Sequence, residues 1–240
     1  MKNLITILYL CLSLNLVFGC IDGVEVELWG ECYNIEETIE LDLSSTDVNG
    51  MIPPEIGDLV NLERVYLIGS GLFGEIPSEI GNLINIKDIR LYGNELTGNI
   101  PLEIGNLVNL EILWISSNQL TGNIPPEIGN LINLFYLNLS LNEMSGVIPD
   151  EICNLPLEIV WLGNNKFCPP YPWCIGTDIG SQDILGCVDL NGDQLVNVQD
   201  VIILVNYVLD SYYEEEGDLN SDTIINIQDI IILIGIILGN

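Results

Sequence analysis

The chain has 240 residues, of which 5 are Lys or Arg, 35 are Asp or Glu and none is His, so its formal net charge is −30. A chain this acidic cannot hold nucleic acid by neutralising phosphates. Without histidine it has no Ser-His-Asp or Cys-His machinery and no His-ligated metal. Hydrophobic residues make up 48% and charged residues 17%, which excludes general disorder, and the length allows one or two domains.

Residues 1–19 have the organisation of a secretory signal peptide. Lys2 supplies a positive start, Leu4 to Phe18 form an apolar run, and the small residue Gly19 follows. The run is shorter than the roughly 20 apolar residues that a membrane span needs. We therefore expect export by a bacterial-type route, and a secreted or cell-surface mature chain with a charge of 4 − 35 = −31.

Cys20 has two interpretations. The residues before it resemble a bacterial lipobox, in which Cys20 would carry a lipid and attach the protein to a membrane. Alternatively, Cys20 forms a disulfide bond. Parity favours the disulfide, because removal of the signal peptide leaves an even number of cysteines, which is typical of exported disulfide-bonded chains: Cys20, Cys32, Cys153, Cys168, Cys174 and Cys187.

Residues 52–167 contain an internal repeat with a period of 24. Five units begin with Ile-Pro, the last of them one residue shorter, at Ile52, Ile76, Ile100, Ile124 and Ile148. The units closely resemble leucine-rich repeats of the plant-like subtype, L-x-x-L-x-L-x-x-N-x-L-x-G-x-I-P, over about residues 38–167. The resemblance implies an α/β-type solenoid, a right-handed coil with a short parallel β-sheet on its concave face.

One such repeat cannot bury its apolar face alone, so each unit must stack on its neighbours. In this family, the asparagine that follows each strand forms a buried ladder, which would consist here of Asn94, Asn118, Asn142 and Asn165. Ser70 takes the place of the first asparagine, so we expect a weaker ladder at that end.

Both ends of a solenoid need caps. Residues 20–51 are predicted to form the N-terminal cap and first strand, because Trp29, Gly30 and Cys32 resemble the cap of plant-type repeat proteins. The resemblance makes Cys20 the natural disulfide partner of Cys32. Residues 168–187 are predicted to form a Cys/Pro-rich C-terminal cap and linker. The four cysteines at that end allow three connectivities, among which the sequence does not choose.

Along each predicted strand, side chains alternate between the core and the concave face. Aromatic and arginine side chains gather among the outward positions: Arg64, Tyr66, Arg90, Tyr92, Trp114, Tyr136 and Trp161. Such a surface is typical of binding sites for an extracellular protein or glycan. The alternative is that these side chains only stabilise the sheet through cross-strand pairs and a salt-bridge lattice.

Residues 188–240 differ in character and contain two segments, 29 residues apart, that read D-x-N-x-D-x-x-x-N-x-x-D. Calcium takes 6–8 oxygen ligands, which a 12-residue loop supplies from positions 1, 3, 5, 7, 9 and 12. We therefore predict two calcium ions. Their ligands would be Asp189, Asn191, Asp193, Leu195, Asn197 and Asp200 in the first loop, and Asp218, Asn220, Asp222, Ile224, Asn226 and Asp229 in the second.

An apolar helix follows each loop, and two such loop–helix units resemble the dockerin domain, here as a small all-α domain. Dockerins attach extracellular proteins to cohesin domains on a scaffold, so the resemblance implies a cohesin-like partner. Gln194 and Thr223 stand at loop position 6, where glycine is usual, and we expect reduced calcium affinity. The apolar helices could pack on each other, cover the solenoid end or form a docking surface; the last is favoured.

The sequence thus predicts a non-catalytic extracellular recognition protein that binds a ligand through its repeats and docks through its calcium-binding module. The repeats leave no room for a separate catalytic domain, so no catalytic residue is assigned. The resemblance to dockerins also suggests an alternative, a component of a polysaccharide-degrading assembly. A further alternative is a purely structural surface protein.

Overall fold

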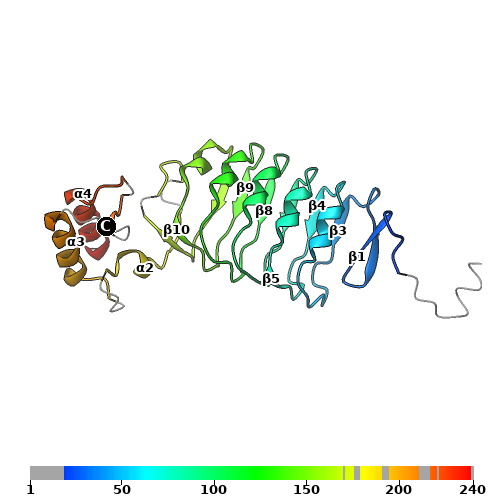
Figure 1. The fold of residues 1–240 in the computed structure, drawn as a ribbon, viewed down its shortest axis with the longest axis horizontal. Helices are drawn as coiled ribbons and strands as arrows, with labels where there is room; N and C mark the ends of the chain where they lie inside the picture. The colour runs from blue at the N-terminus through cyan, green and yellow to red at the C-terminus, as the bar shows by residue number, and fades with distance from the viewer. Residues whose placement is uncertain are drawn as a thin grey trace, which may run out of the picture.

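The computed structural model describes residues 19–169, 171–175, 179–190, 195–210, 217–220 and 222–238. This part of the chain is an elongated solenoid that is followed by a small helical region (Figure 1). The predicted signal peptide lies outside the described residues, apart from Gly19. In the described ranges, no helix is both long and apolar enough to cross a membrane.

Six short strands, one from each coil, form a parallel sheet along the solenoid in the order β11-β9-β8-β6-β4-β3. The central residue of each strand is paired with the central residue of the next, so that these apolar side chains stack inside the coil. The sheet confirms the predicted solenoid. Its strands are β3 (Glu40–Asp42), β4 (Arg64–Tyr66), β6 (Asp88–Arg90), β8 (Ile112–Trp114), β9 (Tyr136–Asn138) and β11 (Ile159–Trp161).

Each Ile-Pro pair leads into a one-turn 3-10 helix, since proline fixes the backbone dihedral φ in a range that suits the approach to a helix. These helices are η1 (Pro54–Asp58), η2 (Ser78–Asn82), η3 (Leu102–Asn106), η4 (Pro126–Asn130) and η5 (Asp150–Asn154). Two small parallel sheets complete the coils, β5 (Phe73–Glu75) with β7 (Glu95–Thr97), and β10 (Ser145–Val147) with β12 (Lys166–Cys168).

The predicted asparagine ladder runs through the core. Asn118 is 9% exposed; its Oδ1 accepts the Leu96 N–H at 3.1 Å, and its Nδ2 donates to the Leu91 and Ile115 carbonyls at 3.0 and 3.1 Å. Asn94, Asn142 and Asn165 repeat this pattern. At the N-terminal end, the Ser70 hydroxyl donates to the Leu43 carbonyl at 2.7 Å. The ladder supplies partners to backbone groups that the turns would otherwise leave unpaired.

A glycine in each of the first four 3-10 helices lets neighbouring coils approach. A Cβ on Gly105 would lie 2.6 Å from the Cβ of Glu127 in the next coil. The fifth helix, η5, has Cys153 at the corresponding position, and this cysteine is bonded to Cys174 of the C-terminal cap. The last coil therefore uses the place of a glycine to attach the cap.

The N-terminal cap is a β-hairpin that the sequence analysis did not predict. Strands β1 (Glu25–Leu28) and β2 (Glu31–Asn34) pair antiparallel. The two residues between them, Trp29 and Gly30, both have positive φ (50° and 85°), as the favoured two-residue hairpin turns require. The Trp29 indole donates to the Met51 carbonyl at 2.8 Å, and Cys20 is bonded to Cys32 as expected.

At the C-terminal end, the third disulfide joins Cys168 to Cys187, so the structure selects one of the three connectivities. Gln182 adds a last member to the ladder. Its Nε2 donates to the Leu162 carbonyl at 2.9 Å, and its Oε1 accepts the Phe167 N–H at 3.1 Å. The side-chain amide of the cap thus replaces the asparagine of a further coil.

The helical region contains α2 (Leu185–Val188), α3 (Val198–Asp210) and α4 (Ile227–Leu238). Helices α3 and α4 pack on each other around a small core of their own, which includes Leu204 and Leu233. Packing on each other was one of the three arrangements considered for these apolar helices, and their outer faces are exposed. Ile202 and Ile231, for example, are 55% and 63% exposed.

Candidate functional site

The outward side chains of the six-stranded sheet form one continuous surface, here called the sheet face. The strand register places them in columns, as the sequence predicts. One column contains Asp42, Tyr66, Arg90, Trp114, Asn138 and Trp161, and the next contains Glu40, Arg64, Asp88, Ile112, Tyr136 and Ile159. The seven proposed ligand-binding residues therefore lie on one surface, with Tyr92 just beyond the end of β6.

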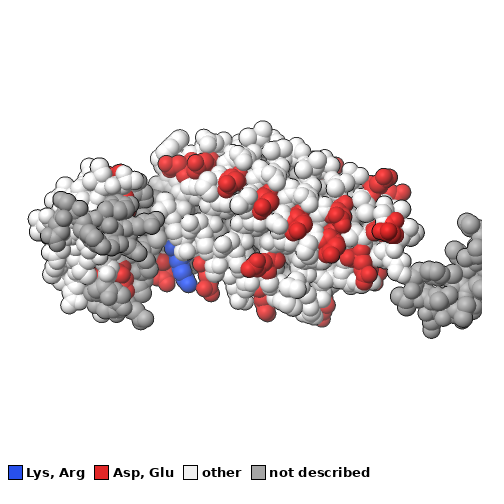
Figure 2. All heavy atoms as spheres, in the orientation of Figure 1, with Lys and Arg blue, Asp and Glu red and all other residues white. Residues whose placement is uncertain are grey.

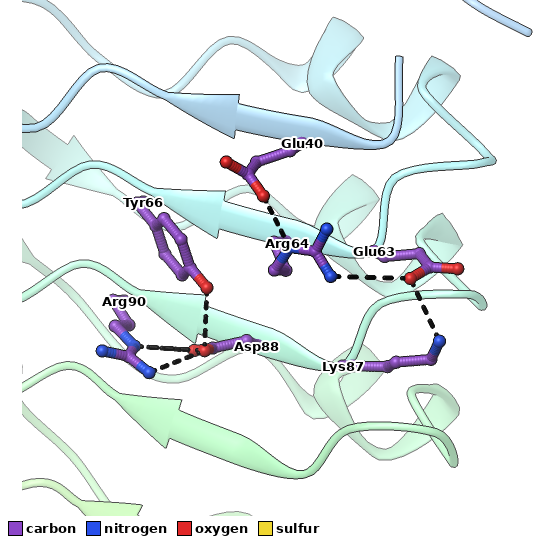
Figure 3. A network of polar contacts seen from close by, with 7 residues as sticks. All are labelled: Glu40, Glu63, Arg64, Tyr66, Lys87, Asp88 and Arg90. Atoms are coloured by element: carbon purple, nitrogen blue, oxygen red, sulfur yellow. Dashed lines mark hydrogen bonds and ion pairs between the residues drawn. The ribbon is translucent and has the colours of Figure 1, made fainter. Parts of the chain in front are cut away.

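Charged residues dominate the N-terminal half of the sheet face (Figure 3). The Arg64 Nε donates to Glu40 at 2.6 Å, and Lys87 contacts Glu63 at 3.0 Å. Arg64 also lies 3.8 Å from Glu63, which links the two pairs. These ion pairs are partly exposed, so each contributes little to stability, about 0–1 kcal/mol. At this end of the sheet they agree with the alternative interpretation, a salt-bridge lattice, with Lys87 and Glu63 as further members.

Arg90 is held more firmly than the other basic residues. It donates two hydrogen bonds to Asp88, at 2.9 and 2.8 Å, and its guanidinium lies 5.2 Å from the centre of the Tyr66 ring. The Tyr66 hydroxyl donates to the same carboxylate at 3.1 Å. Hydrogen bonding to Asp88 raises the pKa of Arg90, while burial and then the Asp88 charge raise the pKa of Tyr66.

Aromatic side chains form a row across the C-terminal half of the sheet face. Tyr92 stacks on Trp114 with ring centres 4.1 Å apart. Trp114 and Tyr136 are 5.7 Å apart, and Tyr136 meets Trp161 edge to face at 5.8 Å. Trp161, at the end of the row, is 50% exposed. These four residues are called the aromatic row below.

The basic side chains of the described chain are all engaged in ion pairs. Arg64, Lys87 and Arg90 pair on the sheet face, and Lys166 contacts Glu143 at 3.3 Å. Acidic side chains, in contrast, extend over the visible surface of the solenoid, where basic atoms appear at one place (Figure 2). The sheet face therefore offers aromatic rings and carboxylates to a ligand, and no unpaired cation.

The second predicted calcium loop is described except for residue 221. Asp218 accepts the Asp222 and Thr223 N–H groups at 3.1 and 2.7 Å. Asp229, which is fully buried in the first turn of α4, accepts the Asn220 and Asn226 N–H groups at 3.2 and 2.7 Å. These bonds curl the loop around its own carboxylates.

The first loop shows the same pattern where it is described. Asp200 is fully buried and accepts the Leu190 and Asn197 N–H groups at 2.9 and 2.8 Å. Asp189 and Leu195 are described, but the predicted ligands Asn191 and Asp193, and Gln194 at position 6, lie outside the described residues. Among the described residues, no three Cys, Asp or Glu side chains are grouped as they would be around a metal ion.

Thr223 takes the backbone conformation that glycine usually provides at position 6. Its φ is +66°, in the left-handed region that β-branched residues rarely adopt. Its N–H is directed to the Asp218 carboxylate. The threonine thus keeps the sharp turn of the loop, at a conformational cost of about 1–2 kcal/mol.

Matching positions of the two loop–helix units expose apolar side chains. Four pairs are separated by the 29-residue spacing of the loops: Leu195 and Ile224, Val198 and Ile227, Ile202 and Ile231, and Leu209 and Leu238. All eight side chains are between 55% and 74% exposed. They are called the helix patch below, and exposed apolar surface of this kind often marks an interaction site.

The structure contains a groove of about 1180 Å³ that the sequence did not predict. It runs along β5, β7 and the Ile-Pro segments of three successive coils, and residues that include Met51, Pro53, Pro77 and Pro101 line it. The repeating Ile-Pro pairs could have indicated it, because each coil places the same apolar segment beside the next.

Residues 85–107, 109–131 and 133–155 match the family described as Leucine Rich Repeat. None of the curated proteins matches the chain. Among solved structures, the chain is similar to a plant peptide hormone receptor, RGFR1, in complex with RGF2, with 37% identity over 53% of this chain and 21% of that chain (TM-score 0.53). It is also similar to PEPR1 in the PEPR1–AtPEP1 structure, with 35% identity over 55% and 19% of the two chains (TM-score 0.54).

A TDR receptor is similar as well, with 38% identity over 60% of this chain and 25% of that chain (TM-score 0.56). The chain thus spans 19–25% of the length of these receptors. It contains leucine-rich repeats and shares the solenoid fold of the receptors.

Proposed function

We propose that this protein is a non-catalytic extracellular recognition protein whose sheet face binds a protein or peptide ligand. The aromatic row carries this proposal. Its four rings lie in contact on the sheet face, and Trp161 at the end of the row is 50% exposed. Large aromatic side chains with one exposed side are the groups that most often dominate binding energy at interfaces.

The similar receptors favour a peptide or protein ligand over a glycan. RGFR1 is a peptide hormone receptor in complex with RGF2. Because the present chain matches only a fraction of that receptor, the comparison suggests the kind of ligand and not its identity. Three disulfide bonds agree with an extracellular location, since such bonds persist in oxidising compartments.

The two C-terminal loops are proposed to bind one calcium ion each. The donor set fits a hard cation, because the predicted ligand positions carry carboxylate, amide and carbonyl oxygens. Asp218, Asn220, Asp222, Asn226 and Asp229 would hold the ion in the second loop, and the ion would offset repulsion between their charges. Thr223 supports this proposal by keeping the glycine-like turn.

The helix patch is proposed to dock the protein onto a cohesin-like partner or a comparable scaffold. Apolar residues at matching positions of the two loop–helix units favour a partner that buries them over a solvated tail. Membership of a polysaccharide-degrading assembly is the second candidate function. It depends on the same docking and on the resemblance of the loops to dockerins.

The sheet-face proposal is tested with the mature chain, a displayed random-peptide library and a glycan array. Selected peptides should bind the unmodified chain and lose at least tenfold in affinity when Trp114→Ala and Tyr136→Ala are combined. The control is Phe73→Ala, which removes an aromatic side chain, 46% exposed, from β5 outside the sheet face. Equal binding by the double variant and the unmodified chain would refute the proposal.

The calcium proposal is tested by calorimetric titration of calcium into the same chain. We expect two ions to bind, and Asp218→Ala to remove one of them without changing binding of peptides to the sheet face. Failure of the unmodified chain to bind calcium at millimolar concentration would refute the proposed metal sites.

A further inference from the structure

We infer that the ligand of the sheet face is a Lys- or Arg-bearing extended segment of a partner protein, whose cations lie over the aromatic row. This inference rests on the proposed binding function and specifies the chemistry of the ligand. It depends on three observations: the charge state of the sheet face, an internal example of the interaction, and the spacing of the rings.

The sheet face cannot attract an acidic ligand. The four basic residues that follow the signal peptide, Arg64, Lys87, Arg90 and Lys166, are each paired with a carboxylate. The chain without its signal peptide has a charge of 4 − 35 = −31. A field of this sign accelerates the approach of cationic partners and opposes anionic ones.

The same sheet already holds one cation in the proposed manner. The Arg90 guanidinium lies over the Tyr66 ring at 5.2 Å while Asp88 accepts its hydrogen bonds. The quadrupole of an aromatic ring attracts a cation placed over its face, and the attraction is stronger where the pair is desolvated. Tyr66 thus has a cation from the same sheet. Arg90 is also the cross-strand neighbour of Trp114, but its guanidinium lies over Tyr66 and not over the aromatic row.

Two strands that carry the aromatic row are each preceded by a glutamate, although the register equivalents of Asp88 on those strands are Ile112 and Ile159. Glu111 directly precedes β8, which carries Trp114, and Glu158 directly precedes β11, which carries Trp161. Both glutamates are exposed, and the ion pairs of the described basic residues do not include them. A cationic segment that follows the row would therefore also approach carboxylates that the described basic side chains do not neutralise.

The ring spacing fits an extended chain. Successive rings from Trp114 to Trp161 are 5.7 and 5.8 Å apart. In an extended segment, side chains on one face are two residues apart, or about 6.6 Å. Cations at alternate positions can therefore lie over neighbouring rings, and the segment would cross about three strand spacings, or roughly 14 Å, between Tyr92 and Trp161.

The test uses the mature chain and calorimetry with four probes. The first is a synthetic peptide with arginine at alternate positions among glycine and serine. In the second and third, glutamine or glutamate replaces every arginine, and the fourth is a neutral β-linked glucose oligosaccharide. We expect the arginine peptide to bind at least tenfold more tightly than the glutamine peptide, and no binding of the glutamate peptide.

Two variants locate the binding, because an acidic protein attracts cationic peptides in general. Combined Trp114→Ala and Tyr136→Ala should weaken the arginine peptide at least tenfold, combined Glu111→Gln and Glu158→Gln should weaken it several-fold, and Phe73→Ala should have no effect. If the aromatic double variant binds the arginine peptide unchanged, the cations bind elsewhere and the inference is wrong. Two other outcomes would overturn the cationic ligand but leave the binding function standing: equal affinity for the arginine and glutamine peptides, or preference for the oligosaccharide. In both cases the aromatic double variant would have to lose the binding.

Discussion

Replacement of Asn118 by alanine should destabilise the solenoid by about 3 kcal/mol. The change removes the acceptor of the Leu96 N–H, which then has no partner in the core and costs about 1–3 kcal/mol. The three carbonyls that receive Nδ2 lose less, because each keeps another donor: Leu91 O the Asn94 amide, Ile115 O the Asn142 amide and Ser116 O the Gly93 N–H. Each of these lost bonds contributes about 0.5–1 kcal/mol.

Asn109→Ala is the matched control, since Asn109 belongs to the same coil and is exposed. Its side chain makes one hydrogen bond, to the Ile84 carbonyl at 2.8 Å, so its loss should cost about 0.5–1.5 kcal/mol. Urea unfolding followed by circular dichroism, with disulfides intact, measures both variants. A cost for Asn118→Ala that is equal to or below that of Asn109→Ala would refute the reasoning about the ladder.

Three other predictions concern single positions. Gly105→Ala should destabilise the solenoid by about 1–3 kcal/mol in urea unfolding, because the new Cβ would meet Glu127 at 2.6 Å. As a control, Gly235→Ala has open space around it in α4 and should raise the free energy of unfolding by up to about 1 kcal/mol. Thr223→Gly should raise the melting temperature and the calcium affinity by removing left-handed strain at φ +66°; a loss of both would contradict this. Tyr66 should ionise later than an ordinary tyrosine, whose pKa is 10.0, because burial and Asp88 raise its pKa. The stabilising contribution of neutral Tyr66 is fully present below its ordinary pKa of 10.0. It is lost as the pH rises through the raised pKa of the folded state. Tyrosinate absorbance of the unmodified chain minus Tyr66→Phe measures this titration, and Asp88→Asn should move it to lower pH.

The sheet face could be predicted from the sequence because two periods act together. The 24-residue repeat aligns the coils, and strand alternation decides which side chains point outward, so the column from Tyr66 to Trp161 follows directly. The ring contacts could not be predicted. They depend on side-chain rotamers, such as the one that lets the Trp114 indole donate to Ser116 at 2.6 Å.

The ends of the solenoid were harder to predict, because they depart from the repeat. The hairpin turn depends on Trp29, an unusual residue at positive φ, and pattern-based reasoning expects glycine, asparagine or aspartate there. Gln182 lies only 17 residues after Asn165 and is not an asparagine. The 24-residue repeat therefore does not predict that its side chain continues the ladder. The cysteine connectivity required the fold, since spacing alone permits three solutions.

The replacement of a glycine by Cys153 has a consequence for how this gene can evolve. The second to fourth coils carry both the glycine where the next coil approaches and the ladder asparagine, so duplication or deletion of a 24-residue segment among them keeps these two contacts. The fifth coil is not interchangeable, because Cys153 occupies that place and binds the cap. Related proteins should therefore differ by whole coils inserted before η5, with longer or shorter sheet faces between unchanged ends.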